Sequence, residues 1–562
     1  MIHSEQSPPA SSPPSISHEY DAVIVGAGAT GGVAAHELGR RGLKVLVLDA
    51  GPQLSPEEAL GNVVTNMAQR LVKVVSRQQS FQALHPGYWK TNPELFVDER
   101  QNPYTTPSDL PFFWTRGRQV GGRSLTWGGC TLRLSDFEFK PASRDGYGDD
   151  WPIQYRDLAP YYDYLEQFLQ IKGNRDGLPQ LPDGFYTGAA KFTPAEAHFR
   201  NVLGDRRPEL PMIISRGFPL HRSHGHPQWA PSSSLGSTLK AALATGNVTV
   251  QPNAVVSHIF FNPTNHQAQG VEYVHRLQKT THGVKARTIV LCASTIESIR
   301  ILLHSTEDYQ PGGLVNPSGL LGRHLMDHMS TMTFFTLPDF IQPNPPFDLS
   351  GCDSFFIPRV VNLHTPHPDF LRGYGLWGGI QRFGVPSLLR NFGNRALGFF
   401  IGYGEVLPRV DNYLELNPHV SDAWGIPVPH IHMSWSDNEQ RMIQHMQTQI
   451  QEMVELMGGQ CIRLTELVRS PFYPERIRQL ESQVMDAAPP GYYIHEVGGA
   501  PMGTSPRNSV VNPFNQLWES PNILVVDGAC WTTAGWQNPT LTEMAITARA
   551  CDYLVNPWKK TS

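Results

Sequence analysis

The stretch YDAVIVGAGATGGVAAHELGRRGLKVLVLDAG, Tyr20 to Gly51, decides the fold. Ala22 to Val25 has the length and apolar content of a short buried strand. The pattern then predicts a helix from about Gly31 to Arg40 and a second strand from Lys44 to Leu48. We therefore expect a strand, a glycine turn, a helix and a second strand that ends in an acid.

The turn of this unit is typical of a nucleotide-binding loop. Gly26, Gly28 and Gly31 stand in G-x-G-x-x-G register, which allows a tight turn, close approach to a pyrophosphate and close packing of helix on strand. The helix that follows would direct its positive end at the phosphates. Asp49 lies about 20 residues beyond the turn, where an acid can bind ribose hydroxyls. The unit predicts an ADP-containing dinucleotide, without separating NAD from FAD.

Composition limits the classes of function. The 562 residues suggest two or more domains, and a net charge of −5 gives no reason to expect nucleic acid or an anionic membrane surface as a partner. Residues 1–17 form a Pro/Ser-rich tail that we expect to be disordered. We see no secretory signal and no apolar run of about 18 residues, so we expect no membrane span and a cytoplasmic location, with export alongside a partner left open.

Cysteine and histidine patterns give no metal site. The six cysteines are scattered without a C-x-x-C, and we expect small buried hydrophobes in a reducing compartment. His221, His224 and His226 have no acid or cysteine at ligand spacing, which favours solvated loop residues. His324 and His328 share one face of a short segment, but that segment belongs to the resemblance described next.

Further segments carry a family resemblance. They are TRGRQVGGRSLTWGG (Thr115–Gly129), TIVLCASTIESIRILLHS (Thr288–Ser305), GRHLMDHMS (Gly322–Ser330), HEVGGAPMG (His495–Gly503) and NILVVDGACWTTAGWQNPTLTEM (Asn522–Met544). In this order, with the N-terminal unit, they resemble the glucose-methanol-choline (GMC) oxidoreductases. The C-terminal motif is most similar to the pyranose oxidase and sugar dehydrogenase branch. The resemblance extends from about Tyr20 to Val555.

The resemblance implies an α/β fold with a Rossmann-like FAD-binding domain assembled from discontinuous segments. These segments would be about 18–60, 110–150, 245–330 and 490–556. An α+β substrate domain with an antiparallel sheet would take about 61–109, 150–245 and 331–489. Beyond the N-terminal turn, the residues expected at FAD are Gly121, Gly122, Ser124, Thr126, Val255, Asp527, Gly528, Pro539 and Thr540.

The same resemblance assigns the chemistry to two residues. Oxidation of an alcohol requires a base for the hydroxyl proton, and histidine can be neutral at working pH. His495 matches the family's base position, and Asn538 matches its hydrogen-bonding partner. Pro539 suits the start of a helix whose positive end would stabilise a reduced flavin. Trp127, Trp536 and Gln537 could line the pocket, with ordinary core packing as the alternative for the tryptophans.

One position departs from the family pattern. Pyranose oxidases commonly carry a histidine that bonds covalently to the flavin, in a GG-x-S-x-H-W context. This chain reads GGRSLTW and has Thr126 there. We therefore expect FAD to be bound without that covalent link.

The sequence thus predicts FAD-dependent oxidation of a CH–OH group in a sugar, glycoside or related polyol. Three alternatives stay open: a lyase of the hydroxynitrile lyase type, an oxidoreductase acting on a non-sugar alcohol, and a binding protein with an inactive site. Oxygen, a quinone or a redox protein could accept the electrons. The oligomeric state and the choice between oxidase and dehydrogenase are not predicted.

Overall fold

Strand β1 (Ile16–Val25) lies at the centre of the larger sheet. It pairs in parallel with β2 (Val45–Leu48) on one side and β7 (Thr281–Leu291) on the other. Beyond β2 lies β4 (Val248–Gln251), and β15 (Ile523–Val525) pairs with the end of β7. Antiparallel strands β5 (Ala254–Phe261) and β6 (Ala268–His275) continue from the start of β7. Segments remote in the sequence thus build one sheet.

Both faces of this sheet are covered, which explains why the C-terminal half of its central strand, Ala22–Val25, is entirely apolar. Helices α1 (Ala29–Gly39), α8 (Thr238–Ala244) and α13 (Thr540–Val555) cover one face. Ala22 and Ile24 pack into that layer, whereas Val23 and Val25 pack into the opposite one. The opposite layer contains α9 (Thr295–His304), on which the hairpin of β12 (Tyr413–Ser421) and β13 (Pro427–His432) rests.

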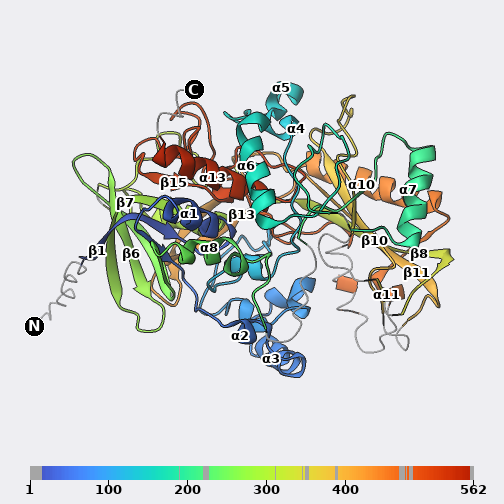
Figure 1. The fold of residues 1–562 in the computed structure, drawn as a ribbon, viewed down its shortest axis with the longest axis horizontal. Helices are drawn as coiled ribbons and strands as arrows, with labels where there is room; N and C mark the ends of the chain where they lie inside the picture. The colour runs from blue at the N-terminus through green and yellow to red at the C-terminus, as the bar shows by residue number, and fades with distance from the viewer. Residues whose placement is uncertain are drawn as a thin grey trace, which may run out of the picture.

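A second, antiparallel sheet forms the other lobe (Figure 1). Its order is β14 (Gln460–Ile462), β8 (Met329–Ile341), β11 (Arg395–Gly404), β10 (Tyr374–Ile380), β9 (Phe355–Ile357) and β3 (Ile213–Ile214). Helix α10 (Asp437–Leu456) packs on β8 and β11, and α7 (Pro194–Arg206) packs on β10. The α/β fold class and the antiparallel sheet of the second lobe are confirmed.

Other helices connect the lobes or lie at their edges. Helix α6 (Tyr155–Leu169) packs on α13, while α2 (Pro56–Leu60) and α3 (Val63–Val75) lie at the lower edge in Figure 1. The shorter helices are α4 (Asp136–Phe139), α5 (Pro141–Asp145), α11 (Leu464–Leu467), η1 (Gln82–Leu84), η2 (Pro86–Trp89), η3 (Pro93–Leu95), η4 (Gly122–Leu125), η5 (Ser234–Gly236) and η8 (Gly528–Cys530).

The computed structural model describes residues 16–188, 190–218, 227–310, 312–344, 346–347, 354–385, 390–467, 475, 478–479 and 485–556. Residues 1–15 of the predicted tail therefore lie outside the described residues. Strand β1 begins at Ile16 rather than at the predicted Ala22, because its pairing with β7 continues to Gly283. Two segments expected in the substrate domain pack with the larger sheet: α8 lies on α1 and β4, and the β12–β13 hairpin lies on α9.

Two expectations about composition can also be compared with the structure. Cys130, Cys292, Cys530 and Cys551 are buried, Cys461 is exposed, and Cys352 lies outside the described residues. Across the described ranges, no helix is long and apolar enough to cross a membrane.

Candidate active site and cofactor cradle

The glycine turn and Asp49 meet because β1 and β2 are in register. Val25 lies opposite Leu48, so Gly26 and Asp49 follow at the same edge of the sheet. The Asp49 carboxylate accepts hydrogen bonds from the backbone N–H of Ala27 at 3.0 Å and of Gly51 at 2.9 Å. Burial raises the pKa of Asp49, and these two amides act against that rise. The acid therefore braces the turn.

The turn fits a pyrophosphate by its shape. Gly26 has φ +101°, and a side chain there would overlap the carbonyl of Cys292. A Cβ on Gly28 would instead meet nothing within 4 Å, which leaves the backbone open to a ligand. Gly28 is also the N-cap of α1 and supplies no side-chain cap. The first amides of α1 are thus the kind of donor that binds phosphate.

The loop of η4 closes over this turn. A Cβ on Gly122 would lie 3.3 Å from the Cα of Gly28, which places Gly121 and Gly122 directly beside the cradle. Ser124 donates to the carbonyl of Gly121 at 2.5 Å and accepts from the amide of Ser234 at 3.0 Å, so its hydroxyl ties the loop together. Thr126 is half-buried, and its hydroxyl donates to the carbonyl of Arg123 at 3.3 Å.

The remaining predicted cofactor residues border the same region. Val255 is buried in β5, one residue after Ala254, whose amide donates to the carbonyl of Asp49. Asp527 precedes Gly528 in η8 and accepts from Ser298 Oγ at 2.5 Å, and burial raises its pKa to about 6. Pro539 is the N-cap of α13, which begins at Thr540 without a side-chain cap. The open turn at Gly28 and the first amides of α1 fit the phosphates of FAD. The uncapped N-terminus of α13 fits the edge of its ring.

The structure brings the side chains of His495 and Asn538 together. Asn538 Nδ2 is 3.4 Å from His495 Nε2, and Tyr403 donates its hydroxyl proton to Asn538 Oδ1 at 3.2 Å. Both side chains are half-buried, so each keeps an accessible edge. The separation of 3.4 Å exceeds the usual range for N–H donors, so this bond is weak. A substrate hydroxyl can replace it.

A second histidine decides which nitrogen of His495 can act as a base. His328 Nε2 lies 2.5 Å from the carbonyl oxygen of Gly535, and His328 Nδ1 lies 2.8 Å from His495 Nδ1. Because a carbonyl only accepts, the proton of His328 is on Nε2. Burial lowers the pKa of His328 to about 4, so the ring is neutral and its Nδ1 accepts. His495 Nδ1 must then donate, which leaves the lone pair on His495 Nε2, beside Asn538.

The main chain at His495 is held by an acid. Asp327 accepts hydrogen bonds at 2.9 Å from the amides of both His495 and Gly491. Ile494 has φ +65°, a conformation that costs a β-branched residue about 1–3 kcal/mol. Arg123 donates to the carbonyl of Ile494 at 3.3 Å and pairs with Glu496 at 2.8 Å. These contacts fix the direction in which the base points.

Aromatic side chains enclose the pair. The rings of Tyr403 and Tyr493 stack at 4.7 Å, and the ring of Tyr493 meets that of His495 at 4.9 Å. Trp536 is fully buried in the same apolar cluster as Tyr403. Gln537 is also fully buried, and no described group hydrogen-bonds its amide. Trp127 is half-buried, and its indole N–H donates to the carbonyl of Ser232 at 3.0 Å.

Sequence reasoning did not assign roles to His328, Asp327, Arg123, Tyr403 or Tyr493. The signal for the first two is the segment GRHLMDHMS, which carries both residues within the family resemblance.

His221, His224 and His226 lie outside the described residues. His324 is half-buried, and burial lowers its pKa. Within the described part of the chain, no group of three His, Cys, Asp or Glu side chains is placed to hold a metal ion.

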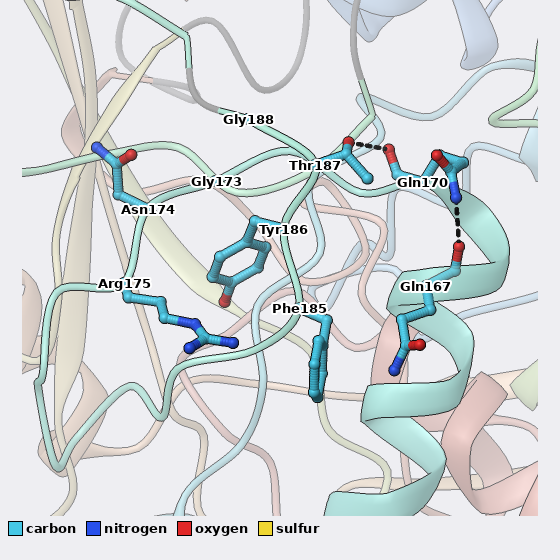
Figure 2. Close-up of a pocket in the computed structure, with 9 residues that line it drawn as sticks. All are labelled: Gln167, Gln170, Gly173, Asn174, Arg175, Phe185, Tyr186, Thr187 and Gly188. Atoms are coloured by element: carbon cyan, nitrogen blue, oxygen red, sulfur yellow. Dashed lines mark hydrogen bonds between the residues drawn. The ribbon is translucent and has the colours of Figure 1, made fainter.

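A cavity of about 460 Å³ lies elsewhere, at the C-terminal end of α6 (Figure 2). Its lining includes Gln167, Arg175, Phe185 and Tyr186, none of which belongs to the His495 site. In the figure the Tyr186 hydroxyl points between Arg175 and Phe185. The catalytic pair and this cavity are separate features.

Comparison with known proteins identifies the family. Two family models, both described as GMC oxidoreductase, match residues 20–330 and 408–547. The chain belongs to the GMC oxidoreductase family. Its members are FAD flavoproteins, and this protein is an FAD-dependent oxidoreductase of the CH–OH class. The comparisons give no support to the lyase alternative.

Individual relatives cover nearly the whole chain. A 2-methyl-1,2-propanediol dehydrogenase of Mycolicibacterium austroafricanum is 26% identical over 95% of this chain and 95% of its own length. The fructose dehydrogenase large subunit of Gluconobacter japonicus is 25% identical over 96% of this chain and 98% of its own length. Among solved structures, pyridoxine 4-oxidase from Mesorbium loti has a TM-score of 0.62 at 17% identity, covering 96% of this chain and 99% of that chain. The structural likeness supports the fold.

Proposed function

We propose that His495 Nε2 removes the hydroxyl proton from a sugar, glycoside or related polyol, with Asn538 as its hydrogen-bonding partner. The observation that carries this proposal is the chain of contacts from Gly535 through His328 to His495. It leaves the lone pair on the one nitrogen that faces Asn538. FAD, when bound, supplies the acceptor for the hydride that leaves the same substrate carbon.

Two features prepare His495 to act as the base. Burial, reinforced by the neighbouring His328 and Arg123, lowers the pKa of His495 well below 6.5, so the ring stays neutral at ordinary pH. Asn538 can donate to the oxygen of the substrate hydroxyl while that hydroxyl donates to His495 Nε2. The amide does not titrate, so it does not compete for the proton. The hydroxyl is thereby oriented with its proton toward the base.

Substrate class is supported by the walls of the site and by the relatives. Tyr493 is half-buried beside His495, and its ring offers a flat, rigid surface that can cover the C–H face of a sugar ring, while the buried Tyr403 stacks behind it. One relative is a fructose dehydrogenase, which favours a sugar. Another acts on a small diol, and this match keeps a non-sugar alcohol as the second candidate.

Three finer properties belong to the same proposal. FAD is held without a covalent bond at the Thr126 position, because a threonine hydroxyl replaces the imidazole that forms that link. The electron acceptor is oxygen, a quinone or a redox protein. The location is cytoplasmic, in keeping with the absence of paired cysteines among the described residues.

An anaerobic titration tests the redox role. Monosaccharides, glycosides and simple alcohols are added to the purified flavoprotein while the visible flavin spectrum is followed. Bleaching by one class supports oxidation and names that class, whereas no bleaching by any compound would refute the proposal. Rapid return of colour in air would favour oxygen as the acceptor.

Replacement of His495 by alanine tests the base. Turnover should fall about 10²- to 10⁴-fold while flavin stays bound, because only proton removal is lost. His324→Asn is the matched control. His324 has φ +60°, which asparagine tolerates, and in the described part of the chain no side-chain hydrogen bond or ring contact joins it to the catalytic pair. Unchanged turnover in His495→Ala would remove this residue from the mechanism.

A further inference from the structure

The first turn of α13 carries an acid that is more accessible than its neighbours. From Thr540 to Asp552, Thr540 and Glu543 are half-buried and every other residue is buried. Residues three positions apart lie on the same side of a helix, so these two share one face. Asn538, which is also half-buried, lies two residues before the helix begins. The accessible side of this helix start therefore extends from Asn538 to Glu543.

Glu543 lies at the same edge of the larger sheet as the glycine turn. Val25, Leu291 and Val525 are aligned across β1, β7 and β15, so the segments that follow these strands lie side by side. In open α/β sheets, ligands bind outside the carboxyl ends of the strands. Helix η8 follows β15, and a Cβ on its Gly528 would meet Glu543 Oε1 at 2.9 Å. The Glu543 carboxyl group therefore lies at the sheet edge that carries the FAD cradle.

The place of Glu543 in the cradle follows from the two helix starts. The first amides of α1 fit the phosphates of FAD, and the N-terminus of α13 fits the edge of its ring. The ribityl chain of FAD joins the pyrophosphate to the ring. To connect these two positions, the chain must pass the ends of β7 and β15, where Gly528 and Glu543 lie.

Glu543 has charged neighbours but no hydrogen-bond partner. In the described part of the chain, the charged groups that act on its carboxyl group are Asp527, Glu496 and Arg123, and none of them hydrogen-bonds it. Arg123 already pairs with Glu496 at 2.8 Å, and Asp527 accepts from Ser298 Oγ at 2.5 Å. Burial, reinforced by Asp527 and Glu496 and opposed by Arg123, raises the pKa of Glu543 to about 8. At pH 7 this carboxyl group is therefore predominantly neutral and has a proton to donate.

We propose that Glu543 is a further FAD-binding residue, whose carboxylic acid O–H donates a hydrogen bond to an oxygen of the ribityl–pyrophosphate chain. That chain offers hydroxyl and phosphate oxygens as acceptors. A buried donor without an acceptor is unfavourable, and a bound cofactor would supply the acceptor. An ionised carboxylate in the same place would repel the phosphates, so the proton belongs to the binding site. This inference concerns the cofactor alone and does not depend on the proposed base or substrate.

The pH dependence of FAD binding gives the first test. Because the protonated form of Glu543 binds FAD, affinity is full below the pKa of this group and is lost as pH rises above it. The holoenzyme is diluted at a series of pH values, and free flavin is separated by ultrafiltration and measured by its fluorescence. The dissociation constant for FAD should be about tenfold larger at pH 9 than at pH 7, because only about a tenth of the carboxyl groups then keep their proton.

Variants of Glu543 give the second test. The amide of Glu543→Gln donates N–H at every pH, so its dissociation constant should equal the wild-type value at pH 7 and stay constant up to pH 9. Glu543→Met has a side chain of similar length without a donor, and it should bind FAD about 2- to 13-fold more weakly at pH 7. Glu519→Gln is the control, because it removes an exposed acid from the C-terminal region, and it should follow the wild-type curve.

Three results would overturn the proposal. A wild-type dissociation constant that does not change between pH 7 and pH 9 would place the proton elsewhere, for example on Glu496 Oε1, which is buried without a partner in the described residues. A Glu543→Gln protein that keeps the wild-type pH dependence would assign it to another group. A Glu543→Gln protein that binds FAD as weakly as Glu543→Met would show that an uncharged donor is not sufficient. Melting temperature reports whether each variant is folded, and the wild-type curve needs no variant.

Discussion

Replacing His328 separates a positioning role from a purely structural one. His328 accepts from His495 Nδ1 and thereby keeps the lone pair of His495 on Nε2. In His328→Ala that Nδ1–H loses its acceptor, at a cost of about 1–3 kcal/mol for a buried donor. The ring can escape this cost by moving its proton to Nε2, and that tautomer cannot act as the base. We therefore expect kcat/KM to fall about 5- to 150-fold.

The pH profile gives the second readout. A base works only when unprotonated, so activity is lost as pH falls through the pKa of His495. Burial holds that pKa well below 6.5 in the wild-type protein. His328 is one of the groups that lower this pKa, so its removal in His328→Ala should raise the pKa toward 6.5 and move the acidic limb of the kcat/KM profile to higher pH. The acidic limb of the kcat/KM profile is measured over the pH range in which the His328→Ala protein keeps its flavin bound.

A conservative variant completes the test. The amide oxygen introduced by His328→Asn would lie near the position of the ring Nδ1 and can accept from His495, so much of the lost activity should return. Melting temperature and flavin content report whether each variant is folded. A His328→Ala protein that is folded, loaded with flavin and unchanged in both turnover and acidic limb would refute the tautomer argument.

Three further predictions concern the cradle and the base. Gly26→Ala should fail to fold, because φ at Gly26 is +101° and a side chain there overlaps the carbonyl of Cys292. Gly28→Ala should fold but bind FAD more weakly, because its Cβ would occupy the open space of the turn. Flavin content after purification distinguishes the two variants, and wild-type loading of both would contradict the assignment of this turn to FAD. Denaturation should release all flavin, and mass spectrometry that finds it attached to the protein would disprove non-covalent binding. Asp327→Asn should lower the free energy of unfolding by about 1–3 kcal/mol, because the amide of either Gly491 or His495 loses its acceptor. Denaturant titration measures this loss, and an unchanged denaturation midpoint would show that Asp327 does not brace the main chain.

The sequence by itself determined the nucleotide-binding unit. The strand, turn, helix and acid from Ala22 to Asp49 are local features, since each depends on neighbours a few residues away. The order of the later motifs was enough to predict the discontinuous first lobe, and it led to the proposal of His495 and Asn538 as the catalytic pair. Both residues lie in glycine-rich segments close to the C-terminus, where the family pattern is dense.

Only the tertiary structure determines which ring nitrogen of His495 carries the lone pair and faces Asn538. His328 and His495 are 167 residues apart, and their contact exists because the segment before β8 runs beside the segment that holds His495. The spacing of α3 predicts an amphipathic helix in any context. Which side faces outward depends on carbonyls of Tyr88 and Thr91 that bind Arg70. Local patterns specify elements, whereas the partners of a side chain are fixed only when remote segments pack together.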